Sequence, residues 1–134
     1  MADAPVVPSQ FCFTLTEGAV ELSPTRRALR QWLAAIGADS DWIDDVLIAA
    51  SEACTNALEH AYGPALGSVE VRAAFVEESL ELVVSDCGAW KEPLDRGNRG
   101  RGRKLMENLM DHAVIESGPA GTVVRMQKEL RLGG

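Results

Sequence analysis

The chain has 134 residues, of which 46% are hydrophobic and 25% are charged, and its net charge is −7 at pH 7. This length and composition indicate one globular domain over residues 1–134, and no apolar run approaches the roughly 20 residues of a membrane span. The acidic balance disfavours direct binding to nucleic acid, which depends on neutralising phosphates, and no membrane partner is expected.

Residues 1–9 carry an acidic residue and no basic ones. They therefore predict a flexible lead-in and not a secretory signal, and with it a cytoplasmic protein. Apolar and polar residues then alternate from Phe11 to Leu15, which predicts a strand at a sheet edge. The three cysteines include no closely spaced pair, so each is expected to be a small buried residue.

The first helix is predicted from Ser23, as cap, with Pro24 at the first helical position, to Gly37. Its three arginines, at positions 26, 27 and 30, lie off the apolar stripe. The pattern favours a solvated face over a partner contact.

A second helix is predicted from Asp41, as its cap, to a stop at Gly63. Its apolar residues recur at steps of three and four and share one face: Ile43, Val46, Leu47, Ala50, Cys54, Ala57, Leu58 and Ala61. The opposite side carries a narrow polar stripe: Asp45, Glu52, Asn56 and Glu59. The stripe by itself is typical of a solvated face, although an amide one turn beyond a carboxylate can also serve one site.

Two alternating runs, residues 69–75 and 80–84, predict a hairpin that ends at Asp86. An irregular loop is expected from there to Gly102, followed by a helix that begins near Lys104. Strands are predicted from Val114 and from residue 122, and residues 131–134 are expected to form a loose tail.

Five of the thirteen basic residues lie within nine positions that also hold three glycines: Arg96, Arg99, Arg101, Arg103 and Lys104, with Gly97, Gly100 and Gly102. This cluster predicts one local anionic ligand, because the acidic remainder of the surface would repel a long polyanion. An RNA-binding element is the alternative interpretation.

Three ordered motifs carry a family resemblance. The stretch from Glu52 to Tyr62 resembles the N box of the GHKL ATPases, in the form found in the anti-sigma-factor serine/threonine kinases. Asp86-Cys87-Gly88 resembles the next box of that family, and residues 100–111 resemble the one after it. Since the order and approximate spacing also agree, the resemblance extends over nearly the whole chain.

Runs of helices and antiparallel strands predict an α/β two-layer sandwich with a mixed, mostly antiparallel sheet and helices on one face. The resemblance identifies this fold as the Bergerat ATP-binding fold. It implies a homodimeric anti-sigma factor that binds ATP with Mg²⁺ and phosphorylates a serine or threonine of an anti-anti-sigma (STAS) antagonist. The first helix would help to hold the sigma factor.

The resemblance also implies a role for each site residue. Asn56 would give its side-chain oxygen to Mg²⁺, Glu52 would be the general base, and Asp86 would accept from the adenine amino group. The remaining positions would contact the base or the phosphates: Gly88 by close backbone approach, Gly100 and Gly102 by N–H groups, Arg103 and Lys104 by charge, and Thr122 through water to adenine. For Thr122, an ordinary strand position is the competing interpretation.

Two other functions stay open on the sequence. One is a binding module in which the nucleotide switches affinity for the sigma factor without phosphotransfer. The other is a sensor-kinase ATPase fragment, disfavoured because the helices that carry a phosphoacceptor histidine and the dimer contact are not recognised in the sequence.

Overall fold

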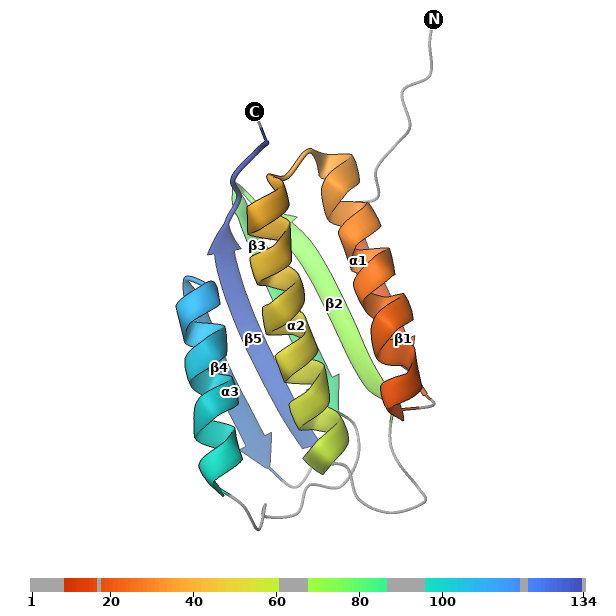
Figure 1. The fold of residues 1–134 in the computed structure, drawn as a ribbon, viewed down its shortest axis with the longest axis vertical. Coiled ribbons are helices and arrows are strands. Elements are labelled where there is room, and N and C mark those ends of the chain that lie inside the picture. Colours follow the sequence, from red (N-terminus) through yellow and green to blue (C-terminus); the bar gives the residue numbers. More distant parts are fainter. Residues whose placement is uncertain (1–8, 17, 61–67, 87–95, 119–120, 134) are drawn as a thin grey trace, which may run out of the picture.

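A computed structural model describes residues 9–16, 18–60, 68–86, 96–118 and 121–133, without the side chains of residues 18–19, 59–60, 96–102 and 117–118. In these residues three α-helices cover one face of a five-stranded sheet, as Figure 1 shows. The strand order is β1-β2-β3-β5-β4 and all four pairings are antiparallel. The predicted two-layer sandwich is confirmed, whereas the expected mixed component is absent from the described strands.

The elements follow one another as β1 (Gln10–Leu15), η1 (Gly18–Glu21), α1 (Leu22–Ile36), α2 (Ser40–His60), β2 (Val69–Val76), β3 (Ser79–Asp86), α3 (Arg96–Leu109), β4 (His112–Gly118) and β5 (Gly121–Glu129). The edge position predicted for the first strand is confirmed, and so is the hairpin of β2 and β3. Glu77 lies in its turn with a φ of 59°. The last strand, β5, lies between β3 and β4 and not at an edge.

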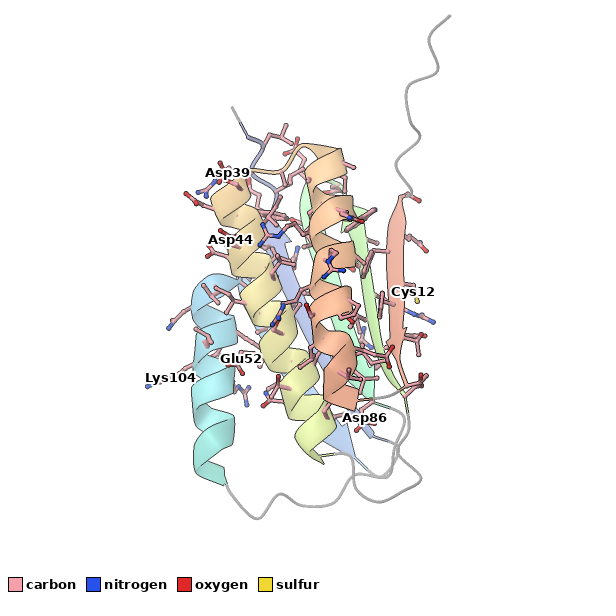
Figure 2. The ribbon with its side chains drawn as sticks, turned by 45° about the vertical axis from the view of Figure 1, so that its right-hand side comes forward. Cys12, Asp39, Asp44, Glu52, Asp86 and Lys104 are labelled. Carbon is pink, nitrogen blue, oxygen red and sulfur yellow. The ribbon has the colours of Figure 1, made fainter. Side chains whose placement is uncertain are left out.

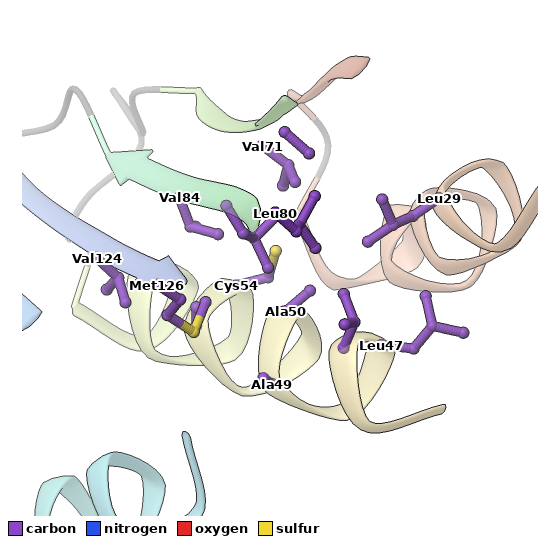
Figure 3. Close-up of a cluster of buried hydrophobic side chains, with 14 of the residues drawn as sticks. Leu29, Leu47, Ala49, Ala50, Cys54, Val71, Leu80, Val84, Val124 and Met126 are labelled. Atoms are coloured by element: carbon purple, nitrogen blue, oxygen red, sulfur yellow. The ribbon is translucent and has the colours of Figure 1, made fainter. Parts of the chain in front are cut away.

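The core lies between the helices and the sheet. Alternate residues of β2 and β3 point into it, because side chains along a strand alternate between faces. On α2 the buried side chains are large near the start of the helix, where Trp42 and Val46 lie, and small from residue 49 onward: Ala49, Ala50, Ala53, Cys54 and Ala57. Figure 3 shows Cys54 in one cluster with Leu80 and Met126, from β3 and β5. Small side chains let the second half of α2 approach its neighbours closely.

Both predicted helix caps are wrong by two residues. Helix α1 begins at Leu22 with Glu21 at its cap, because the 3₁₀ turn η1 runs directly into it. Helix α2 is capped by Asp39 and not by Asp41: the Asp39 carboxylate accepts from the backbone N–H groups of Asp41 and Trp42 at 3.1 and 3.2 Å. The predicted stop at Gly37 is confirmed, with a left-handed φ of 97°.

Two further boundaries differ from the prediction. Helix α3 begins at Arg96, so residues 96–102 are helical and not irregular. Each glycine in residues 96–102 lowers helix stability, but every residue added to a helix also gains a backbone hydrogen bond. Strand β4 begins at His112, two residues before the predicted start at Val114, because His112 pairs with Gln127.

The expectation of a loose tail is wrong for residues 131–133. The backbone N–H of Asp39 donates to the carbonyl of Arg131 at 2.8 Å, and that of Gly133 donates to Gly37 at 2.9 Å. Gly134 and the lead-in of residues 1–8 lie outside the described residues.

The cysteines differ in their exposure. Cys54 is buried, as expected, whereas Cys12 is exposed on β1, which corrects the expectation for that residue; Cys87 lies outside the described residues. Burial raises the pKa of the Cys54 thiol to about 12. Only the thiolate is an effective nucleophile, so Cys54 should be inert at neutral pH.

We therefore predict that a thiol reagent at pH 8 labels Cys12 rapidly and leaves Cys54 unlabelled until the protein unfolds. Peptide mass spectrometry separates the two sites from Cys87. Equal labelling rates at Cys12 and Cys54 in the folded protein would contradict the packing of α2 described above.

Candidate functional site

Two of the residues singled out in the sequence meet across neighbouring strands. Asp86, the last residue of β3, is directly opposite Thr122 in the β3–β5 register. Opposite residues of an antiparallel pair share a face, and Asp86 is only 3% exposed, so both side chains lie on the side that the helices cover. The sequence predicted each residue separately, but not this contact, because it gave no sign that β5 inserts beside β3.

Thr122 brings an unsatisfied polar atom to this place. Its hydroxyl oxygen, Oγ1, is buried and has no hydrogen-bond partner in the described part of the chain. A buried hydroxyl without a partner costs free energy, so such atoms in folded proteins call for an explanation. A ligand with a polar edge would supply one. Together with the Asp86 carboxylate, this fits a flat group that both donates and accepts hydrogen bonds, as adenine does.

Glu52 and Asn56 lie one turn apart in the second half of α2. Both are partly buried, as is Asp45 in the same stripe, so this stripe is not a fully solvated face. Helix α2 packs against α1, α3, β2 and β3, which fixes its position over the sheet. Figure 2 shows Asp86 at the end of the molecule where α2 ends, with Glu52 further back along the same helix. The side chains of Glu59 and His60 are outside the description.

Glu52 also lines a groove of about 770 Å³ between α1 and α2. The wall from α1 carries Arg26, Arg27 and Arg30, and the α2 side includes Ser51 and Thr55. Arg30 pairs with Asp44 at 3.0 Å, whereas Arg26 and Arg27 form no ion pair with any described residue. The sequence pointed to these arginines only as a solvated face. The sequence could not predict the groove, because the distance from these arginines to Glu52 depends on how α1 packs on α2.

The groove and the strand pair are separate places. None of Asn56, Asp86 and Thr122 lines the groove, and Glu52 on α2 is the site residue that does. Glu52 therefore belongs both to the polar stripe of α2 and to the lining of the groove.

The basic residues predicted for phosphate binding are not gathered at this site. Lys104 is exposed and extends from α3 on the side away from α2, as Figure 2 shows. Arg103 is exposed too and lies 3.8 Å from Glu107 one turn along the helix. Since α3 begins at Arg96, the N–H groups of Gly100 and Gly102 lie beyond its first four residues, where helix N–H groups bond within the helix. Gly88 is outside the described residues.

Comparison with known proteins identifies the class to which this fold and site belong. Residues 15–128 match the family model of the histidine kinase-like ATPase domain. The chain is therefore a domain of that ATPase class.

Its relatives place it more closely. It is similar to the serine-protein kinase RsbW of Bacillus velezensis, with 38% identity over 112 residues that cover 71% of this chain and 69% of the relative. The anti-sigma F factor of Caldanaerobacter subterraneus subsp. tengcongensis is 32% identical over 99 residues, covering 64% of this chain and 69% of the relative. The chain belongs to this family of anti-sigma serine-protein kinases.

A crystal structure of the RsbU and RsbW domains of a Mycobacterium tuberculosis protein has the same fold, with a TM-score of 0.75 and 30% identity. The match covers 92% of this chain and 33% of that longer chain. The likeness thus extends from sequence to nearly the whole described structure.

We predict that Thr122→Val makes the protein more stable and weakens its binding of adenine nucleotides. The variant keeps the β-branched shape but removes the unsatisfied hydroxyl, so its free energy of unfolding should rise by about 1 kcal/mol. Adenine-nucleotide affinity should fall in the same variant. Thermal unfolding and calorimetry measure the two effects, with Thr122→Ser as the control that keeps the hydroxyl. A variant that is less stable than wild type would argue against an unsatisfied hydroxyl.

Proposed function

We propose that this protein is an anti-sigma factor that binds MgATP and phosphorylates a serine or threonine of a STAS-type antagonist. Membership of the family supports this proposal, and the observation that carries it is the buried Asp86 opposite the unsatisfied Thr122 hydroxyl. A carboxylate accepts from the exocyclic amino group of adenine, which guanine does not present at that position. The site therefore favours ATP over GTP.

Asn56 is the residue that would hold Mg²⁺. An amide oxygen suits this ion, which prefers oxygen ligands and retains several waters, so one protein ligand and the phosphates are sufficient. When bound, Mg²⁺ neutralises charge on the phosphates. Asn56 lies one turn beyond Glu52 and is only partly exposed. Its partial burial limits the conformations that its side chain can adopt.

Glu52 is the proposed general base. Its carboxylate takes the proton from the acceptor hydroxyl while that oxygen bonds to the γ-phosphorus, and the bond to the β-phosphate oxygen breaks to release ADP. The position of Glu52 in the α1–α2 groove supports this role, because the groove gives an acceptor segment a route to the carboxylate. Such a base typically contributes about 10²–10⁴-fold in rate.

The groove also supports the proposed partners. Arg26 and Arg27 present two unpaired guanidinium groups there, a suitable surface for acidic side chains of a sigma factor or its antagonist. The sheet face opposite the helices is uncovered in the described residues, which leaves room for a second copy in the proposed homodimer. Among the described helices, none is long and apolar enough to cross a membrane. We place the protein in the cytoplasm, where sigma factors act.

One observation favours the alternative of a nucleotide-switched binding module. Lys104 points away from α2, and Gly100 and Gly102 lie inside α3, so the groups proposed for the phosphates are not assembled in this conformation. The nucleotide would then set the affinity for the sigma factor without phosphotransfer. The two functions differ in whether a phosphorylated antagonist is formed.

We predict that Asn56→Ala weakens MgATP binding by about tenfold or more, since loss of a group that holds a metal typically has at least this effect. The fold should survive, because Asn56 is not part of the core. Calorimetry with MgATP and with ATP in EDTA measures the change. Equal MgATP affinity in variant and wild type would reject Asn56 as the magnesium ligand.

We further predict that Glu52→Gln leaves MgATP affinity within a few-fold but lowers phosphotransfer to a STAS partner by about 10²-fold or more, because glutamine keeps the size of the side chain and loses its basicity. Binding to the sigma factor should persist. If wild type forms no phosphorylated antagonist while it binds the sigma factor in a nucleotide-dependent way, the kinase proposal fails and the switch remains. Full transfer by Glu52→Gln would instead exclude Glu52 as the base.

A further inference from the structure

The end of β5 holds the beginning of α2. Trp42, in the first turn of α2, is 2% exposed, and its indole Nε1–H donates to the backbone carbonyl of Glu129 at 2.8 Å. The bond joins the last residue of β5 to the helix that carries Glu52 and Asn56. A buried indole with its N–H satisfied in this way has little freedom to shift.

Asp39 makes a second connection at the same place. Its Oδ2 atom accepts from the N–H groups of Asp41 and Trp42, and Arg131 Nη2 lies 3.0 Å from it. The Arg131 hydrogen bond is the main reason that the pKa of the Asp39 carboxyl is lowered, so this carboxylate stays ionised at neutral pH. One side chain thus caps α2 and ties it to the residues after β5.

Backbone bonds complete the connection. Asp39 N–H donates to Arg131, Gly133 N–H donates to Gly37, and Ala38 and Leu132 form an isolated β-bridge. We call this set of contacts, between residues 37–42 and residues 129–133, the C-terminal clasp. Nothing in the catalytic proposal uses the C-terminal clasp.

The same end of β5 anchors α3. Glu129 N–H donates to the Asp111 carboxylate at 2.7 Å, and Lys128 Nζ donates to the carbonyl of Leu109, the last residue of α3. Helices α2 and α3 are therefore both fixed at the end of the molecule that holds the clasp. The site residues lie toward the other end: Asp86 at the end of β3, Thr122 at the start of β5 and Asn56 near the end of α2 (Figure 1).

Because α2 is one continuous helix, its angle at the clasp affects where Asn56 lies. Asn56 lies sixteen residues beyond the start of α2 at Ser40, about 24 Å at the rise of an α-helix. A tilt of about 5° at the clasp would then displace Asn56 by about 2 Å, as long as a Mg²⁺–oxygen bond. Magnesium demands near-ideal octahedral geometry, so an error of this size would remove the ligand.

We propose that the C-terminal clasp positions Asn56 for magnesium relative to the adenine-binding strands, with Asp39 and Arg131 as positioning residues. The inference rests on the proposed nucleotide site. It requires that changes at the clasp, at the far end of α2, lower the contribution of Mg²⁺ to nucleotide affinity.

The test is calorimetry of ADP binding with Mg²⁺ and with EDTA, on Asp39→Asn, Arg131→Ala and the double variant. Asparagine caps a helix as well as aspartate does, so Asp39→Asn removes the charged bond to Arg131 and keeps the cap. Each single variant should weaken MgADP binding about three- to fivefold, and the double variant should be no weaker than the singles. Binding in EDTA should stay unchanged, a pattern that general destabilisation would not produce.

The control is Arg125→Ala. Arg125 lies on β5, the strand that ends at the clasp, but on the sheet face away from the helices. The variant removes its exposed ion pair with Glu116 of β4 at 3.2 Å. This variant should bind MgADP like wild type. Clasp variants that keep the full Mg²⁺ effect, or that lose affinity equally in EDTA, would overturn the positioning role. A wild type whose ADP affinity does not depend on Mg²⁺ would instead reject the magnesium site itself.

Discussion

The packing of α2 is the constraint on which the other features depend. This helix contacts both other α-helices and the two strands β2 and β3, and it carries the residues proposed for metal binding and proton transfer. From Ala49 onward its buried side chains are small, so its second half lies close to its neighbours. A larger residue at Ala53 or Ala57 would displace the helix and with it Glu52 and Asn56, since a packed core does not absorb added volume. The chemistry and the core are therefore not independent in this segment.

The sheet makes the second contribution by bringing together residues that are distant in the chain. Asp86 and Thr122 are separated by α3 and β4, yet they are direct neighbours because β5 returns to the middle of the sheet. The hairpin partner of β5 is β4, so the chain places its last strand between two earlier ones. As a result the buried carboxylate and the unsatisfied hydroxyl lie on one face at one end of the sheet. Neither residue alone would define a binding site.

The sequence predicted the local part of this structure. The alternating runs predicted β2 and β3, and the 3.6-residue period predicted α2. The roles of Glu52, Asn56 and Asp86 come from the family motifs and stay predictions. The sequence could not give what depends on packing: that Arg26 and Arg27 line a groove with Glu52, or that Lys104 faces away from α2. Glycine content misled the prediction for residues 96–102, because propensity is weaker than the gain from extending an existing helix. The tail was misjudged for a similar reason, since its bonds to Gly37 and Asp39 are non-local.

The residues proposed for nucleotide binding lie at the opposite end of the molecule from the clasp. At the clasp, Trp42 donates to the Glu129 carbonyl and Asp39 accepts from Arg131. Beside the clasp, Lys128 donates to the carbonyl of Leu109 at the end of α3. At the other end, the buried Asp86 lies opposite the unsatisfied Thr122 hydroxyl. A ligand can shift a conformational equilibrium only by its differential affinity for the two states. A nucleotide at Asp86 and Thr122 would therefore influence the groove between α1 and α2 only if its contacts with α2 differed between two states. Glu52 is placed for such a contact, because it lies one turn before Asn56 and also lines the groove with Arg26.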